Sequence, residues 1–261
     1  MADVKEIKKT AKKAKTADPK EVSIDPATQE MLARAQALGI ETVFDRAVNM
    51  KPCNIGNQGT CCKNCSMGPC RLPLPKDYDE ASDDRKGLCG ATANTIAARN
   101  FIRMVAGGAA AHSDHGRSVA EVFMSAARKE TDIYKIKDEA KLRQIAPFLE
   151  VATTVEVDGE TLDRDTDEIA LEVAEKALDE WGKAEGEVLY MKRAPKARYE
   201  TWKKQGVLPR NIDREIVEIM HRTHMGVDQD YKNLMKQGVR AALADGWGGS
   251  MLATDLQDVL F

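Results

Sequence analysis

The residues of this chain best suited to chemistry are its cysteines. All six lie between Cys53 and Cys89, and five of them fall between Cys53 and Cys70. Clustered thiols form either disulfides or metal sites. Disulfide frameworks are typical of small secreted domains, whereas the first residues here include no apolar segment of the kind that a secretory signal carries. We therefore interpret the cysteines as metal ligands in a reducing compartment, the cytoplasm.

The spacing of the cysteines divides them into two groups. Cys61 and Cys62 are adjacent, and neighbouring side chains of an extended backbone point in opposite directions. One compact four-ligand site should therefore not use both. The division gives a pair, Cys53 and Cys61, and a group of four, Cys62, Cys65, Cys70 and Cys89.

The group of four fits either of two metal centres. Four thiolates that begin with a C-x2-C pair bind Zn²⁺ or a [4Fe–4S] cluster. Zinc ribbons usually offer two C-x2-C pairs, and this chain has only one, Cys62 to Cys65. Gly68 also allows the backbone to approach a bulky centre closely. The pattern favours an iron–sulfur cluster, and zinc is the alternative.

Cys53 and Cys61 supply only half of a four-thiolate site. A twofold axis through a homodimer would present the same two residues twice and complete the site. We therefore predict a cluster that two copies of the chain share. The alternative is that Cys53 and Cys61 are thiols without a metal.

Two histidines, His112 and His115, form an H-x2-H pair. Ser113 and Asp114 are both suitable N-caps, so we expect a helix to begin between the two histidines. The positive end of its dipole would favour neutral imidazoles, which can both donate and accept a proton. The pair is a candidate proton relay, and a purely structural role is the alternative.

The elements that must position these residues are mostly helices. Aromatic residues make up only 5% of the chain, which suits helices better than a β-sandwich. We expect Gly107-Gly108 to interrupt the helix that begins at Thr92 or Asn94, and short strands only at 151–157 and 188–191. Capping and breaking residues predict the helices at 26–38, 41–49, 92 or 94 to about 105, 113 or 114 to about 126, 138–145, 165–181, 212–225 and 231–244.

The same pattern predicts the domains. Residues 1–24 are polar and rich in lysine and are expected to form a flexible arm. Residues 25–52 should form N-terminal helices, and residues 53–90, where apolar periodicity fails, should form an irregular cluster-binding segment. Residues 91–261 should form a helical domain.

Composition excludes several classes of function. A net charge of −3 argues against a general nucleic-acid binder. No apolar run approaches the length of about 18 residues that a membrane-spanning helix needs. The 43% of apolar residues in 261 is enough for one substantial core or two small ones.

Four segments of the sequence together resemble the N-terminal part of the anaerobic nickel–iron carbon monoxide dehydrogenase catalytic subunit. They are CNIGNQGTCCKNCSMGPCRLP at 53–73, GLCGATANTIAARN at 87–100, GGAAAHSDHGR at 107–117 and EIMHRTHMG at 218–226. The segment ALADGWGGSMLATDLQDVLF at 242–261 also looks like that family. The resemblance extends from about residue 28 to residue 261. It implies a mainly α fold, the helical N-terminal domain of an architecture related to the hybrid-cluster proteins, with an irregular cluster-binding loop.

In that family this part of the chain holds two iron–sulfur clusters. The resemblance implies that the [4Fe–4S] B-cluster is bound by Cys62, Cys65, Cys70 and Cys89. It implies that Cys53 and Cys61 hold half of the D-cluster, a [4Fe–4S] or [2Fe–2S] centre shared across a homodimer axis.

The family reaction is CO + H₂O giving CO₂, two protons and two electrons. It occurs at a nickel–iron–sulfur C-cluster, and electrons leave through the B- and D-clusters to a ferredoxin-type acceptor. The enzyme works either alone or with an acetyl-CoA synthase. The C-cluster ligands belong to later α/β domains that are absent from this chain, so we expect no nickel site in it and no activity from this segment alone.

The resemblance also assigns roles to the histidines. His112 matches the family histidine that reaches the active-site cluster, and His115 matches the next step of a proton path. Ser118 and Glu121 stand where family members often have further histidines. The alternative function is a stand-alone iron–sulfur electron-transfer protein without a catalytic site of its own. A zinc-stapled helical interaction module is a third candidate.

Overall fold

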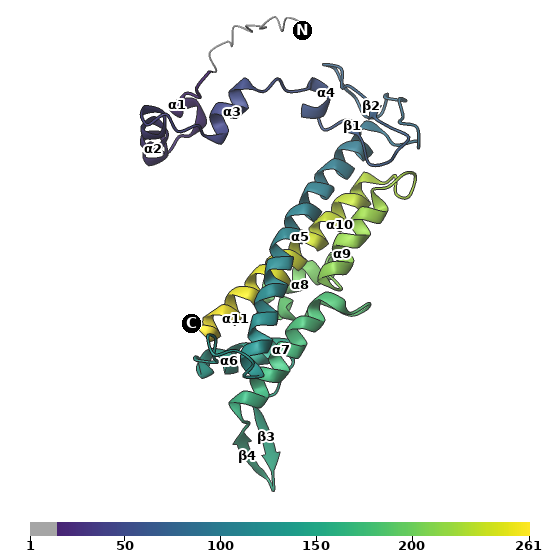
Figure 1. Ribbon diagram of the computed structural model, residues 1–261. Helices are drawn as coiled ribbons and strands as arrows, with labels where there is room; N and C mark the ends of the chain where they lie inside the picture. The colour runs from purple at the N-terminus through teal and green to yellow at the C-terminus, as the bar shows by residue number, and fades with distance from the viewer. Residues whose placement is uncertain (1–14) are drawn as a thin grey trace, which may run out of the picture. The chain divides into compact units, whose positions relative to one another are not determined.

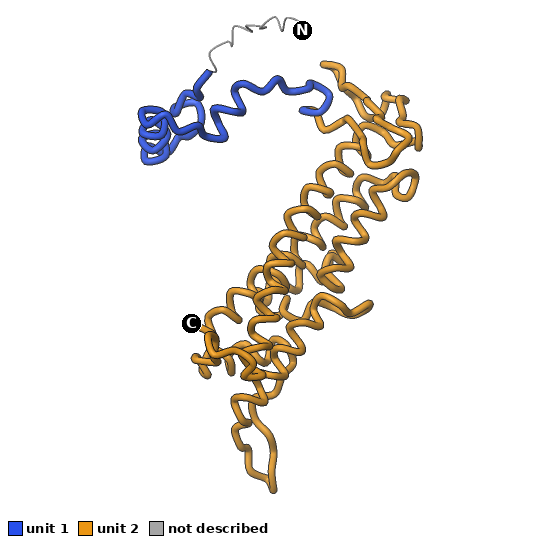
Figure 2. Tube along the Cα trace, in the orientation of Figure 1, with its two compact units in different colours: residues 1–57 blue, residues 58–261 orange. Residues whose placement is uncertain are grey.

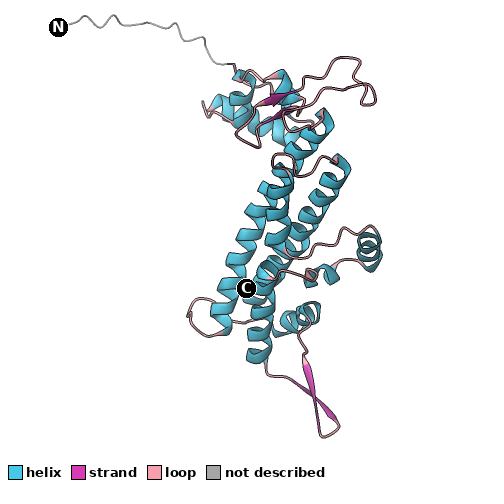
Figure 3. Ribbon diagram, turned by 90° about the vertical axis from the view of Figure 1, so that its right-hand side faces the viewer, coloured by secondary structure: helices cyan, strands magenta, loops and turns pink. Residues whose placement is uncertain are grey.

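The computed structural model describes residues 15–261, which divide into two compact units, 15–57 and 58–261 (Figure 2). Helices make up most of the described residues, in which strands form only two short pairs (Figure 3). The expected mainly α class is therefore confirmed. No helix in residues 15–261 combines the length and the apolar character needed to cross a membrane.

The unit of residues 15–57 contains short helices. They are α1 (Pro19–Val22), α2 (Pro26–Ala37), α3 (Val43–Asn49) and α4 (Asn54–Asn57). Asp25 caps α2 by accepting a hydrogen bond from the Thr28 N–H at 2.7 Å. Thr42 and Asp45 form a capping box at the start of α3. The helices predicted at 26–38 and 41–49 are therefore confirmed.

The flexible arm predicted over residues 1–24 is corrected at its C-terminal end. Residues 1–14 lie outside the described residues. In the rest of the arm, Asp18 caps α1, and the buried Ala17 donates its N–H to Asp45 Oδ1 at 2.8 Å. Because this bond joins the segment to α3, residues 15–22 belong to the folded unit.

The unit of residues 58–261 is built along one long helix, α5 (Ala93–Ala127) (Figure 1). Two paired strands precede it, β1 (Cys61–Cys62) and β2 (Cys70–Arg71). The elements that follow it are α6 (Glu139–Ile145), η1 (Ala146–Leu149), β3 (Thr154–Val157), β4 (Glu160–Asp163), α7 (Thr166–Gly182), η2 (Leu189–Arg193), α8 (Lys196–Lys204), α9 (Ile212–Arg222), α10 (Tyr231–Leu243), η3 (Ala244–Met251) and α11 (Leu252–Leu260).

Helix α5 is continuous, so the predicted break at Gly107-Gly108 is wrong. Glycine costs about 1 kcal/mol relative to alanine inside a helix, but tertiary packing of one face supplies most of the stability of such a helix. Ser113, a predicted N-cap, is a buried interior residue of α5 whose carbonyl accepts a hydrogen bond from Trp181 Nε1 at 3.2 Å. Asp114, the other predicted cap, is also inside α5.

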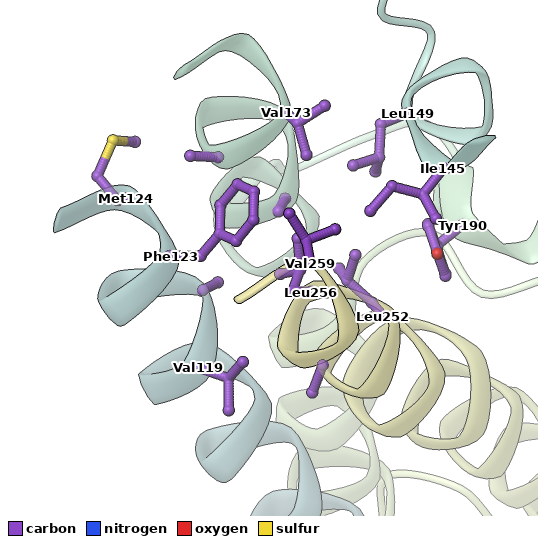
Figure 4. Packing of buried hydrophobic residues seen from close by; sticks show 14 of the residues in the cluster. Val119, Phe123, Met124, Ile145, Leu149, Val173, Tyr190, Leu252, Leu256 and Val259 are labelled. Carbon is purple, nitrogen blue, oxygen red and sulfur yellow. The ribbon is translucent and has the colours of Figure 1, made fainter. Parts of the chain in front are cut away.

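The C-terminal helices pack along α5. The run from α10 through η3 to α11 follows α5 over much of its length, and α7 packs against it as well (Figure 1). In the main apolar core, Phe123 of α5 lies beside Leu256 and Val259 of α11, with Val173 of α7 close by (Figure 4). Closer to Gly107 and Gly108, Ile102 and Ala106 of α5 are buried in a second cluster with residues of α9 and α10. Packing in the two clusters, one on each side of the glycine pair, supports the continuous helix.

The other predicted elements agree with the structure except at one segment, and the strands β1, β2 and β4 lie outside the two segments where strands were expected. The helices predicted at 138–145, 165–181, 212–225 and 231–244 are confirmed within a few residues. The segment at 151–157 contains β3, which pairs with β4 so that Val155 faces Leu162. The strand predicted at 188–191 is wrong, because this segment enters the 3₁₀ helix η2, where the buried Tyr190 N–H donates to the Glu180 carboxylate at 3.2 Å.

Candidate metal centre

The antiparallel pair of β1 and β2 sets the directions of three cysteines. Cys62 lies directly opposite Cys70, and Cys61 lies opposite Arg71. Side chains alternate along a strand, and directly paired residues share a face. Cys62 and Cys70 therefore lie on one face and Cys61 lies on the other, as the adjacency of Cys61 and Cys62 predicts.

The four cysteines of the predicted B-cluster group line one pocket. Cys62 is buried, and the other three are half-buried. The remaining lining residues come from the cluster-binding segment, α5 and the turn after α9; they are Asn64, Met67, Gly68, Leu88, Arg99, Thr223 and Met225. Segments distant in the sequence thus place four thiols around one space.

Glycines allow the loops to close tightly around this pocket. A Cβ on Gly68 would lie 3.1 Å from both the Cys62 carbonyl oxygen and the Cys70 nitrogen. A Cβ on Gly87 would lie 3.2 Å from Cys70 Cβ and 3.4 Å from its Sγ. The Leu88 N–H donates to Cys70 Sγ at 3.4 Å. The backbone of the loop therefore holds this sulfur in place.

Cys89 is surrounded by donors that favour its thiolate. Arg99 Nη1 donates to Cys89 Sγ at 3.5 Å, and Gln229 Nε2 lies 4.0 Å from the same sulfur. Burial raises the pKa of Cys89, but the Arg99 side chain and the N–H groups of Ala91 and Gly226 outweigh it and lower the pKa to about 7. The form that binds metals is the thiolate, so Cys89 is prepared for ligation near neutral pH.

Two polar groups at the pocket test whether a cluster fits there. Arg99 Nε and Asn64 Nδ2 are buried N–H donors without a partner in the described part of the chain. Buried donors are almost always paired, so both groups call for acceptors inside the pocket. As placed, no three Cys, His, Asp or Glu side chains of residues 15–261 could hold a single metal ion. The sulfur atoms of a cluster bound by four thiolates fit both donors.

Cys61 and Cys53 belong to different units. Cys61 is half-buried on β1, and its carbonyl oxygen accepts a hydrogen bond from Asn100 Nδ2 at 3.1 Å, so α5 fixes its backbone. Cys53 is exposed and directly precedes α4 in the unit of residues 15–57. That the two residues share a cluster with a second copy stays a prediction.

His112 and His115 lie in the middle of α5, so the predicted effect of a helix N-terminus on them is wrong. His112 is exposed, and its Nδ1 lies 3.1 Å from Asp245 Oδ2. The other oxygen, Asp245 Oδ1, is buried without a partner in the described residues. Burial raises the pKa of Asp245, although the hydrogen bond to His112 opposes this shift. The polar group that His112 contacts is therefore the Asp245 carboxyl and not a helix N-terminus.

The cysteine and histidine motifs give no indication of Asp245. This residue lies in η3, a π-helical segment inserted between α10 and α11. Such segments are rare and occur frequently at functional sites. The sequence feature that could have indicated this segment is ADGWGGS at 244–250, where glycines interrupt an otherwise helical pattern.

His115 lines a separate groove. Its neighbours there include Ser118, Val122 and Phe261. The Ser118 hydroxyl donates to the Asp114 carbonyl oxygen at 3.2 Å, and Glu121 is exposed on the same helix. The role of His115 in a proton path stays a prediction.

The cluster pocket and the His112–Asp245 pair are two sites on one helix. Arg99 at the pocket and His112 both belong to α5, and a rise of about 1.5 Å per residue separates them by about 20 Å along the helix axis. His112 therefore does not reach the cysteine pocket of its own chain. Its ring is exposed and does not line that pocket.

Comparison with known proteins decides the family. The sequence matches the model of the Prismane/CO dehydrogenase family over residues 60–261. The match contains five of the six cysteines, all four histidines and Asp245. The chain belongs to the Prismane/CO dehydrogenase family. The resemblance seen in the sequence is thereby confirmed.

Similar members of the Prismane/CO dehydrogenase family are carbon monoxide dehydrogenases. Carbon monoxide dehydrogenase 1 of Methanosarcina acetivorans is 48% identical over 242 residues, which are 92% of this chain and 36% of the relative. A nickel-free crystal structure of carbon monoxide dehydrogenase from Thermococcus sp. AM4 matches with a TM-score of 0.79 at 44% identity, covering 95% of this chain and 37% of that chain.

A third similar protein is a chain of an acetyl-CoA synthase/carbon monoxide dehydrogenase whose structure describes NiZn[Fe4S4] and NiNi[Fe4S4] clusters. It matches with a TM-score of 0.75 at 35% identity, covering 97% of this chain and 37% of that chain. The present chain thus spans about a third of the length of the carbon monoxide dehydrogenases that it matches.

Proposed function

We propose that this chain is the N-terminal electron-relay and dimerisation part of an anaerobic carbon monoxide dehydrogenase, an enzyme that converts CO and H₂O to CO₂, two protons and two electrons. Membership of the Prismane/CO dehydrogenase family supports the enzyme class. The observation that carries the relay role is the pocket of four cysteines, which also holds two buried donors without a partner among residues 15–261.

The pocket would hold a [4Fe–4S] B-cluster on Cys62, Cys65, Cys70 and Cys89. When bound, such a cluster supplies one-electron redox chemistry. The residues of the chain ligate it, exclude water through the burial of Cys62 and donate hydrogen bonds to its thiolates from Leu88 N–H and Arg99. These residues take part in electron transfer and do not bind or convert CO.

Cys53 and Cys61 would hold half of a D-cluster, [4Fe–4S] or [2Fe–2S], which a second copy completes. Exposed large apolar side chains are typical of surfaces that another chain covers. The unit that carries Cys53 exposes several of them, Ile24, Met31, Leu38, Val43 and Met50. Electrons would leave this shared centre for a ferredoxin-type acceptor, in the cytoplasm.

His112 and Asp245 would complete a nickel–iron–sulfur C-cluster site carried by later domains of the complete protein. An ionised Asp245 accepts the Nδ1–H of His112, which leaves His112 Nε2 to take or give a proton. The exposed ring is open to groups outside this chain. Because the reaction releases two protons, His115 is proposed to pass a proton onward from this site.

Two further assignments concern partners. Similarity to a chain of an acetyl-CoA synthase/carbon monoxide dehydrogenase supports a complex with an acetyl-CoA synthase. The second candidate function is a stand-alone iron–sulfur electron-transfer protein. It is favoured by the fact that all four cysteines of the pocket come from this chain, so that a cluster there needs no later domain.

The two candidate functions differ in CO-dependent reduction of a viologen dye. The complete protein that contains residues 1–261 should reduce the dye with CO. His112→Ala should lower the rate by about 100-fold or more, as expected for loss of a proton-transfer group, without changing the iron content. The exposed His221 on α9 provides the control, and His221→Ala should keep the rate. Full iron and sulfide without CO-dependent reduction would contradict the dehydrogenase and favour the electron carrier.

A further inference from the structure

Arg99 is a buried cation that forms no ion pair with a carboxylate of residues 15–261. Its side chain is 1% exposed. Nη2 donates to the Asp228 carbonyl oxygen at 2.6 Å, Nη1 donates to Cys89 Sγ at 3.5 Å, and Nε has no partner among residues 15–261. The Asp228 carboxylate is paired with Arg222 instead, at 3.5 Å. The guanidinium therefore lines the cysteine pocket, and the charged partners open to it there are the thiolates.

A buried charge of this kind is strongly unfavourable unless an opposite charge lies beside it. A guanidinium does not deprotonate in proteins, so Arg99 cannot become neutral. The groups at the pocket that can supply negative charge are its thiolates. A [4Fe–4S] cluster with four thiolates carries net negative charge, which grows by one unit when the cluster accepts an electron.

We propose that Arg99, assisted by Asn64, sets the reduction potential of the cluster in this pocket, an inference that rests on the proposed function. The fixed charge of Arg99 attracts the reduced form more strongly than the oxidised form, so it favours uptake of the electron that CO oxidation supplies. Asn64 acts in the same direction, because its buried Nδ2–H is available to a cluster sulfur. Net charge and hydrogen bonds to sulfur are determinants of cluster potentials.

The surrounding contacts hold Arg99 in this orientation. Thr95 Oγ1, one turn earlier on α5, donates to the Gln229 carbonyl oxygen at 2.8 Å. Gln229 Nε2 donates in turn to the Cys89 carbonyl oxygen at 2.8 Å. The segment of Asp228 and Gln229 is thus bonded to α5, to Arg99 and to Cys89. The guanidinium cannot turn away from the sulfur without losing its hydrogen bond to the Asp228 carbonyl oxygen in this anchored segment.

The chain offers a matched control in Arg103. It lies one turn after Arg99 on α5, is half-buried and does not line the pocket. Its Nε donates to Thr223 Oγ1 at 2.8 Å and its Nη2 donates to the Met220 carbonyl oxygen at 3.4 Å. Arg103→Gln removes the same charge from the same helix at a more hydrated position.

The test is an anaerobic redox titration of the full chain loaded with iron and sulfide. Dithionite is the reductant, and the readout is the electron paramagnetic resonance signal of the reduced cluster. The signal of the pocket cluster is identified as the one that is absent in Cys65→Ala. Arg99→Gln should lower the equilibrium constant for reduction about tenfold or more, which for a one-electron couple is about 59 mV toward more negative potential. The reduction potential of Arg99→Lys should stay close to that of wild type. Asn64→Leu should make the potential more negative, by less than Arg99→Gln does. Arg103→Gln should leave it unchanged.

The outcomes separate this inference from the proposed function. An Arg99→Gln variant that keeps its cluster at the wild-type potential would overturn the role of Arg99 and leave the cluster assignment intact. Equal shifts in Arg99→Gln and Arg103→Gln would overturn it as well, since any positive charge would then suffice. If Arg99→Gln loses the cluster, an unchanged potential in Asn64→Leu overturns the proposal and a negative shift supports it. A wild-type chain that binds no cluster would overturn both proposals.

Discussion

Gly116 on α5 and Gly249 in η3 approach so closely that a Cβ on Gly116 would lie 2.5 Å from the Gly249 carbonyl oxygen. His112 and Asp245 lie about one turn before these glycines on the same two segments, and 3.1 Å joins Nδ1 to Oδ2. The two segments run in the same direction, as Figure 1 shows. The backbone contact between the glycines therefore fixes the separation at which His112 meets Asp245.

The glycines of α5 should respond to alanine in opposite ways. Gly116→Ala forces a methyl group against the Gly249 carbonyl and should lower the free energy of unfolding by about 1–3 kcal/mol. Gly107→Ala meets nothing within 4 Å and should raise it by about 0.5–1 kcal/mol. Urea denaturation of the two variants and wild type measures both changes. Equal effects of the two substitutions would contradict the close contact of α5 with η3.

The raised pKa of Asp245 makes a prediction for the pH dependence of stability. A carboxyl whose pKa is higher in the folded state than in the unfolded state opposes folding at neutral pH, and this cost disappears as the pH falls below both pKa values. Asp245→Asn removes the cost, so at pH 7 this variant should unfold with a larger free energy than wild type. The difference should shrink as the pH falls toward about 4. A difference independent of pH would show that the carboxyl is not the cause.

The same substitution should reduce activity. An amide at position 245 carries no negative charge to stabilise a protonated His112, so proton transfer becomes harder. In the complete protein, CO-dependent dye reduction by Asp245→Asn should fall about tenfold or more. Asp114→Asn, at an exposed residue of α5, is the control and should retain the rate. An Asp245→Asn enzyme as fast as wild type would contradict a role of Asp245 in proton transfer by His112.

The two groups of cysteines should lose different amounts of iron. Cys65→Ala should lose about four iron atoms per chain and destabilise the surrounding loops, because cluster binding contributes folding free energy. Cys61→Ala should lose about two iron atoms per chain and weaken the dimer. Iron assays and analytical ultracentrifugation of both variants, with Ser66→Ala as control, test the division. A Cys61→Ala chain with full iron and a normal dimer would contradict the shared cluster.

The grouping of the cysteines is predictable because it depends on local geometry. Cys61 and Cys62 point apart wherever the backbone is extended, as it is in β1. The pairing of Cys62 with Cys70 was not predicted, because no strands were expected in residues 53–90. The continuity of α5 is not predictable in this way. The local cost of Gly107 and Gly108 is known from the sequence, but the packing that outweighs it comes from helices much later in the chain.

The polar partners of the two sites cannot be predicted from the sequence either, because they come from distant positions in the chain. His112 and Asp245 are 133 positions apart, and Arg99 and Asp228 are 129 positions apart. No spacing rule connects residues at such separations. A motif identified the cysteines and histidines, whereas only the folded chain identifies the carboxylate and the guanidinium that act on them.

Metal and sulfide analysis of the chain purified without oxygen, with its mass in solution, tests the central claim that its cysteines hold one intrachain and one shared iron–sulfur cluster. With [4Fe–4S] centres at both sites, the account predicts about six iron and six sulfide per chain in a dimer. Zinc without sulfide, in a monomer or a dimer, would contradict it.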